Sequence, residues 1–245
     1  MKKYLSVILL LVFASAHSQS INENFSISNT QMTTIQIDPT VVYDSDGNRK
    51  GMSYSEISGS PFLFDDWETA IVYDNNLKKI AVVKVKYNDY SGQIHFLNTN
   101  RQELVADKKQ IKRVEVLKDT IKGEVKLVLE KGFSDNKNTL SPNQFVEVLN
   151  NGSNELLKQT VNKIIQVDSL FGTMKVNRFS TSVSYYLKTP TNCEHLKGLD
   201  HTEIVSSLPA KDVIAEFEKN NKHKLKKEKD IIDFLNYYNS KTLIL

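Results

Sequence analysis

Alternation of apolar and polar residues with a period of two dominates the middle of the chain. In "KKIAVVKVKYN", Val83, Val85 and Tyr87 alternate with lysines, which predicts a strand with one face in a core and one in water. Similar stretches follow and are interrupted, about every nine residues, by short polar turns such as "NDYSG" and "KDTIKG". This spacing is typical of antiparallel neighbours joined by tight connections.

We expect roughly nine or ten strands between Met32 and Lys188. A single flat sheet rarely holds so many strands without curling or splitting in two. The last of them places Phe179, Thr181, Val183 and Tyr185 on one face. The expected strands lie in "MTTIQID", "KKIAVVKVKYN", "GQIHFLN", "RQELVAD", "KQIKRVEVL", "GEVKLVLEKGF", "QFVEVLNN", "ELLKQTVNKIIQV" and "RFSTSVSYYLK".

The period changes to that of helices after Thr189. Val213, Ile214 and Phe217 have helical spacing in the first stretch, which Pro209 precedes, and "KEKDIIDFLNYYNSK" repeats the pattern. Both helices are too short to be stable alone, so we expect them to pack on the β-domain or on each other. The fold class is therefore mainly β (α+β): an antiparallel β-sandwich or barrel-like meander followed by two short C-terminal helices.

The first residues are typical of a secretory signal peptide. Two lysines precede an apolar run from Leu5 to Ala14, and small residues follow, so we expect cleavage after Ala16 or Ser18. The run is short for a membrane-spanning helix and polar residues follow it, which favours removal over anchoring. We expect an exported protein, periplasmic or extracellular, with no membrane span after cleavage.

Four segments follow from these patterns. Residues 1–18 are the signal peptide, and residues 19–58 form an N-terminal leader, a first strand and a loop. Residues 59–190 form the antiparallel β-domain, and residues 191–245 the helical pair packed on it.

Composition narrows the function classes. The chain of 245 residues is 40% hydrophobic and 25% charged, which is ordinary for a globular protein. Without Lys2 and Lys3, the excess of basic over acidic side chains falls from three to one. Nucleic-acid binding would need a strongly basic face, so we expect no such partner. The single cysteine, Cys193, excludes an internal disulfide and leaves an intermolecular one open.

The stretch "GSPFLFDDWETA" gathers the side chains of a sugar-binding or hydrolytic site. Asp65 and Asp66 are adjacent, however, and on an extended chain they point to opposite sides, which disfavours an acid–base pair. We interpret them as turn or bulge residues that bond neighbouring backbone. Trp67 is favoured as a core or edge anchor over a sugar platform.

The cluster "CEHLKGLDH" supplies potential ligands of a transition metal in Cys193, His195, Asp200 and His201. It lacks the paired spacing of structural zinc sites, so a linker with Asp200 or Thr202 as helix N-cap is preferred over a metal site or a Cys–His nucleophile. "DSDGN" at Asp44–Asn48 lacks the later ligands of a calcium loop and is interpreted as a turn.

No other motif indicates chemistry. The basic run from Lys219 to Asp230 is interpreted as a solvated link between helices, and the chain contains no P-loop, no glycine-rich dinucleotide turn and no nucleophile elbow. We therefore assign no catalytic, cofactor-binding or metal residue and expect no cofactor.

The order of several short motifs is similar to that of exported Bacteroidota proteins of unknown function. These motifs are "GSPFLFDDWETAIVY", "VKVKYNDYSGQIHFL", "SVSYYLK" and the tail "LPAKDVIAEFEKNNKHKLKKEKDIIDFLNYYNSK". The resemblance extends from about Gly59 to Lys241 and implies an exported β-meander with a helical tail. It implies no activity and no catalytic residues.

The leading hypothesis is an exported envelope protein that acts as a binding or structural module without catalysis. Its partner would be an envelope protein, a peptide or a glycan, received at a sheet edge or in a groove. The alternatives are a hydrolase that uses carboxylates such as Asp65 and Asp66, a small outer-membrane β-barrel, and a carrier of small ligands.

Overall fold

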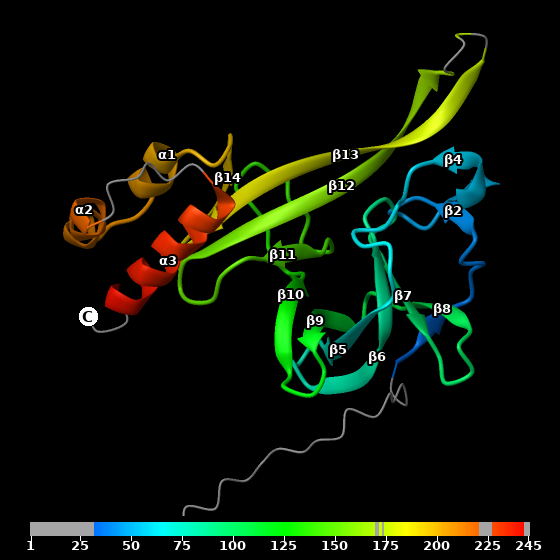
Figure 1. The fold of residues 1–245 in the computed structure, drawn as a ribbon, viewed down its shortest axis with the longest axis horizontal. Helices are drawn as coiled ribbons and strands as arrows, with labels where there is room; N and C mark the ends of the chain where they lie inside the picture. Colours follow the sequence, from blue (N-terminus) through cyan, green and yellow to red (C-terminus); the bar gives the residue numbers. More distant parts are fainter. Residues whose placement is uncertain (1–31, 170–171, 173, 221–226, 243–245) are drawn as a thin grey trace, which may run out of the picture.

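The computed structural model describes residues 32–169, 172, 174–220 and 227–242. The expected signal peptide, residues 1–18, lies outside them. The described chain forms one mixed sheet of 12 strands, a separate two-stranded sheet and three C-terminal helices (Figure 1). The expectation of a mainly β fold followed by short C-terminal helices is confirmed.

The strands are β1 (Thr34–Ile35), β2 (Val41–Tyr43), β3 (Arg49–Ser53), β4 (Ile57–Ser58), β5 (Glu68–Asp74), β6 (Lys79–Asn88), β7 (Gln93–Leu97), β8 (Glu103–Ala106), β9 (Ile111–Asp119), β10 (Glu124–Glu130), β11 (Val146–Val148), β12 (Glu155–Asp168), β13 (Lys175–Lys188) and β14 (Cys193–Leu196). A short 3-10 helix, Tyr54–Glu56, precedes β4. The helices are α1 (His201–Ser206), α2 (Lys211–Asn220) and α3 (Glu228–Thr242).

The large sheet has the strand order β1-β8-β7-β6-β5-β9-β10-β11-β12-β13-β14, in which β1 and β14 are the two ends. Neighbours along this path are antiparallel, whereas β4 pairs with β13 in parallel through Ile57 and Asn177. The sheet is strongly curved around β5, β6 and β9 (Figure 1). It curls as the number of strands predicts, but within the described residues it does not close into a barrel.

The longest pairing joins β12 and β13 over all 14 residues of each strand. This hairpin projects beyond the rest of the molecule at its far end (Figure 1). Of the residues expected on one face of β13, Phe179 is buried, whereas Val183 is 47% exposed. The alternation in β13 is therefore only partly matched by burial. In the described sheet, β4 pairs with β13 at Asn177 and Arg178 and β14 pairs with it from Tyr185 on, so only β12 lies beside the middle of the strand.

Two large apolar clusters define the core. One includes Val83, Val85 and Tyr87, as predicted, and is built from the curved part of the sheet. The other packs α1, α2 and α3 against the end of the β12–β13 hairpin at which β12 begins and β13 ends. It includes Leu156, Phe217 and other buried apolar residues. The helical pair expected to pack on the β-domain does so. None of the described helices has the length and apolar character that a membrane crossing requires.

Several short elements differ from the expectation. The first strand is only two residues long, and "CEHL" forms strand β14 rather than a linker, because Cys193 and Leu196 pair with Lys188 and Tyr185 of β13. The described chain has one helix more than the two expected: α1, which is six residues long and precedes them. Such short elements depend on partners distant in the sequence, so local periodicity does not reveal them.

Candidate functional site

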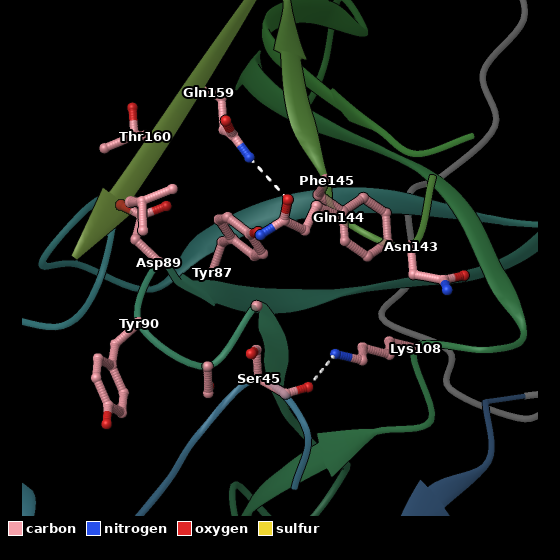
Figure 2. Close-up of a pocket in the computed structure, with 13 residues that line it drawn as sticks. Ser45, Tyr87, Asp89, Tyr90, Lys108, Asn143, Gln144, Phe145, Gln159 and Thr160 are labelled. Carbon is pink, nitrogen blue, oxygen red and sulfur yellow. Dashed lines mark hydrogen bonds between the residues drawn. The ribbon is translucent and has the colours of Figure 1, made fainter. Parts of the chain in front are cut away.

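A hollow of about 90 Å³ lies where the β6–β7 turn, the loop before β11 and the strand β12 meet. Figure 2 shows Asp89, Gln144, Gln159 and Thr160 arranged around it, with Lys108 at another side. Tyr87 and Phe145 add an aromatic part to the lining. With Ser45 of the β2–β3 turn and Lys108 of the β8–β9 turn, the site combines residues from five parts of the chain that only the fold brings together.

The β6–β7 turn is held rigidly by Asn88, which is fully buried. Its Oδ1 accepts hydrogen bonds from the backbone nitrogens of Tyr90 and Ser91, both at 3.0 Å. Gly92 closes the turn by donating its backbone N–H to the Asn88 carbonyl at 2.8 Å, with a φ of 64° that favours glycine. The turn predicted from "NDYSG" is confirmed, and its geometry fixes the position of Asp89.

Asp89 is anchored through its backbone on two sides. Its N–H donates to the carbonyl of Pro61 at 2.8 Å, and its carbonyl accepts from the N–H of Asn162 in β12 at 3.3 Å. The residue is only 6% exposed. Its Oδ1 is buried and has no hydrogen-bond partner in the described part of the chain. Asp89 also lines the hollow, and because buried polar atoms are nearly always paired, its unpaired carboxyl oxygen makes this residue a candidate ligand contact.

The surroundings of Asp89 favour its protonated form. Burial, and then the charge of Glu147, raise its pKa to about 8, while Lys158 acts in the opposite direction. Burial also raises the pKa of Glu147, which Lys158 again opposes. At pH 7 Asp89 is therefore mainly a neutral carboxylic acid, with one O–H donor and acceptor oxygens.

Lys158 serves several carboxyl groups at once. Its Nζ lies 3.6 Å from Oε1 of Glu147 and 3.4 Å from Oε2 of Glu228. Tyr185 donates its hydroxyl to the same Glu228 oxygen at 2.8 Å. Since the ammonium is shared between these two carboxylates, it compensates Asp89 only from a distance.

Hydrogen-bonded amides form the adjoining wall. Gln159 donates its Nε2 to Oε1 of Gln144 at 2.8 Å (Figure 2). Its Oε1 accepts a hydrogen bond from the hydroxyl of Tyr186 at 3.0 Å. The ring of Tyr87 meets that of Phe145 edge-on, with centroids 5.9 Å apart. Because the amides are fixed by each other, the wall presents a polar surface that is already formed before any ligand arrives.

Lys108 supplies the positive side of the hollow. Its Nζ donates to the carbonyl of Ser45 at 3.0 Å, and it forms no ion pair with the described residues. Burial lowers the pKa of this lysine, and only the charge of Asp46 opposes the effect. A partly buried ammonium held by a neutral carbonyl retains capacity to bind an anionic group.

The aspartates that the sequence raised as candidates lie elsewhere. Asp65 and Asp66 are exposed and precede β5, which begins at Glu68. The hydrogen bonds to neighbouring backbone that we expected for their side chains are not among those formed by the described chain. Nothing in their geometry supports an acid–base pair.

Trp67 directly precedes β5 and lies outside the apolar clusters of the described residues. It lines a second, more open hollow of about 460 Å³ with Lys84 and Arg101. Lys84 donates to the Trp67 carbonyl at 3.3 Å, and Nζ of Lys86 lies 5.4 Å from the centroid of the indole ring. Lys84 and Lys86 therefore already have contacts within the described part of the protein, unlike Oδ1 of Asp89.

Cys193 and His195 share one face of β14, as expected from their spacing. Cys193 is buried beside Tyr186, and burial raises the pKa of its thiol to about 11. The His195 ring packs edge-on against Tyr186 at 5.1 Å. A buried thiol with a raised pKa is a poor nucleophile and a poor metal ligand.

The remaining candidates have structural roles. Asp200 is the N-cap of α1 and accepts from the backbone nitrogens of Thr202 and Glu203, which confirms that interpretation. Nε2 of His201 lies 3.2 Å from Glu218. Within the described ranges, no three His, Cys, Asp or Glu side chains converge as metal ligands would.

The polar segment "DSDGN" forms a turn organised by Asp44. Asp44 accepts from the backbone nitrogens of Asp46 and Asn48 and pairs with Lys50 at 2.7 Å, so "DSDGN" is the expected turn. Most of the basic link between α2 and α3, residues 221–226, lies outside the described residues.

Sequence reasoning missed the site at Asp89. An aspartate in "NDYSG" is ordinary for an exposed turn, and no local signal distinguishes it. Comparisons with protein-family models, curated proteins and solved structures found no match to this chain. Interpretation of the site therefore rests on its own geometry.

Proposed function

We propose that this protein is an exported, non-catalytic binding module of the cell envelope that holds a small polar ligand in the hollow at Asp89. The proposal is carried by Asp89, which lines the hollow and whose buried Oδ1 has no hydrogen-bond partner among the described residues. A ligand donor at this oxygen would remove the cost of the unpaired group. Export is supported by the resemblance of the first residues to a signal peptide.

The rest of the lining supports reversible binding. Gln144 and Gln159 are fixed by their mutual hydrogen bond, and the backbone of Asp89 is held at both its N–H and its carbonyl. Such a site needs little rearrangement when a ligand enters, which lowers the entropic cost of binding.

Thermal denaturation with a panel of small polar compounds tests the proposal. We expect at least one compound to raise the melting temperature of the wild-type protein. Asn143 is exposed at the edge of the hollow, so Asn143→Trp should block that effect. Asn236→Trp, on an exposed position of α3, is the matched control and should leave it intact. A panel without any stabilising compound, or an effect that survives Asn143→Trp, would contradict the proposal.

A hydrolase is the second candidate, favoured by one observation. Asp89 has a raised pKa and lies in the electrostatic field of a second buried carboxyl, Glu147. A carboxyl that stays protonated in the field of a second carboxyl can donate its proton to a leaving group. Hydrolysis of chromogenic glycosides or esters by the wild-type protein, abolished in Asp89→Asn, would establish it. Absence of turnover at pH 5 to 8 would leave binding as the function.

A further inference from the structure

The hollow has groups of opposite charge on different walls. Asp89 contributes a carboxyl with an unpaired oxygen, and Lys108 contributes an ammonium held by a neutral carbonyl. Figure 2 shows the two side chains on different sides of the lining. A ligand with two complementary ends would satisfy both walls at once.

In the described part of the chain, no cation forms an ion pair with the Asp89 carboxyl, and the charge of Lys158 acts on it only from a distance. Lys158 is shared between Glu147 and Glu228, at 3.6 and 3.4 Å, and forms no hydrogen bond with the Asp89 carboxyl. A protonated amine would bring a positive charge and up to three N–H donors to the carboxyl of Asp89. Its charge would also lower the pKa of Asp89, so that this carboxyl releases its proton to the solvent and pairs with the amine as a carboxylate.

Among the described residues, no carboxylate forms an ion pair with Lys108, although the charge of Asp46 acts on it from a distance. The ammonium donates to the Ser45 carbonyl at 3.0 Å, which satisfies one of its three donors and leaves its charge without a direct counter-charge in the described chain. A carboxylate at this side would form a charge-assisted hydrogen bond, which is stronger than one to a neutral carbonyl.

We propose that the ligand of this hollow is a small zwitterion of the free α-amino-acid class, with its amine at Asp89 and its carboxylate toward Lys108. This inference rests on the binding function proposed above and specifies its ligand. The volume of about 90 Å³ suits a compact molecule. The rings of Tyr87 and Phe145 provide an apolar surface for a short side chain.

Calorimetric titration with alanine and its two fragments tests the inference. Propionate lacks the amine of alanine, and ethylamine lacks its carboxylate, while both keep nearly the same size. We expect alanine or glycine to bind, and each fragment to bind at least about tenfold more weakly, because one charge-assisted contact is lost. Fragments that bind as tightly as alanine would overturn the inference.

Two variants assign the ends of the ligand. Asp89→Asn should abolish the preference for alanine over propionate, and Lys108→Gln the preference for alanine over ethylamine. Asp66→Asn and Lys109→Gln, which alter exposed residues outside the lining, should keep both preferences. Far-ultraviolet circular dichroism of each variant establishes that it is folded.

The outcomes separate this inference from the proposed function. Suppose that glycerol or a neutral sugar binds, that alanine does not, and that Asn143→Trp blocks the binding. The hollow is then a ligand site, but the assignment of a zwitterionic ligand is wrong. If none of these compounds binds to the folded protein, both proposals fail. Preferences unchanged in Asp89→Asn would also overturn the assignment of the amine.

Discussion

Asn239 of α3 accepts two hydrogen bonds from Asn154, one from its backbone nitrogen at 3.1 Å and one from its side-chain amide at 2.9 Å. The Asn239 amide donates in return to the carbonyls of Asn151 and Asn154, at 3.1 and 2.9 Å. Both Asn154 and Asn239 are buried. Gly152 in the same turn has a φ of 131°, and a Cβ there would collide with the Asn239 amide. This contact fixes α3 to the turn before β12.

Asn239→Ala should lower the free energy of unfolding by about 3 kcal/mol, because it leaves several buried polar groups unpaired. Asn236→Ala, on the exposed side of the same helix, is the matched control and should change it by less than about 0.5 kcal/mol. Urea denaturation followed by circular dichroism measures both. Equal stabilities of the two variants would show that the asparagine contact contributes little.

Asp89 should make the protein less stable as the pH rises from about 4 to 8. Its pKa is about 8 in the folded protein, raised by burial and by Glu147, and Tyr87 and Lys158 are the other titratable groups coupled to it. Below the unfolded-state pKa of about 3.9 both states hold the proton, so no penalty exists. Between the two values the unfolded chain releases a proton that the folded protein keeps. The unfolding free energy then falls by at most about 1.4 kcal/mol per pH unit.

Asp89→Asn removes this penalty, so its unfolding free energy should fall less steeply between pH 5 and 8 than that of the wild type. Urea denaturation at several pH values gives the two slopes, and Asp66→Asn controls for the loss of one exposed carboxylate. Parallel slopes for the wild type and Asp89→Asn would contradict the burial of an unpaired carboxyl at this position.

Leu77 occupies a turn position that suits glycine. Its φ is 59°, and Asp74 organises the turn by accepting from the backbone nitrogens of Asn76 and Lys78. Leu77 is 55% exposed, so its replacement loses little apolar contact. Leu77→Gly should therefore raise the unfolding free energy by about 1 kcal/mol, because a residue with a Cβ is strained by about that much in the left-handed conformation and glycine is not.

Gly47 provides the reciprocal experiment. Its φ is 85°, and nothing lies within 4 Å of the position that a Cβ would occupy, so Gly47→Ala introduces backbone strain without a steric clash. We expect a loss of about 1 kcal/mol, measured by the same denaturation. A stabilising Gly47→Ala would show that strain does not determine the stability of these turns.

Cys193 should be inert in the folded protein. Burial raises the pKa of its thiol to about 11, so at pH 8 only about one molecule in a thousand carries the reactive thiolate. Reaction with an aromatic disulfide reagent should be slow in buffer and fast in urea, and non-reducing electrophoresis should show a single chain. Rapid labelling of the native protein would contradict the buried position.

Local patterns predicted most of the longer elements. Val83, Val85 and Tyr87 alternate because a strand with one buried face requires that spacing. Phe217 and Tyr238 are buried on α2 and α3 as helical periodicity indicated. The pairing of β4 with β13, through Ile57 and Asn177, carries no such signal, because two residues separated widely in sequence meet only after the sheet has formed.

The sequence by itself determined the alternating strands, the polar turns at "DSDGN" and "NDYSG" and the two amphipathic helices, because each follows from contacts between near neighbours. The tertiary structure decided that the sheet stays open and that the β6–β7 turn is buried. Asp89 is a candidate site because the fold buries its side chain beside the hollow with one oxygen unpaired in the described chain, while Pro61 and Asn162 hold its backbone from both sides. Burial of a polar turn depends on what packs over it. This is a property of the whole fold and not of the five turn residues "NDYSG" themselves.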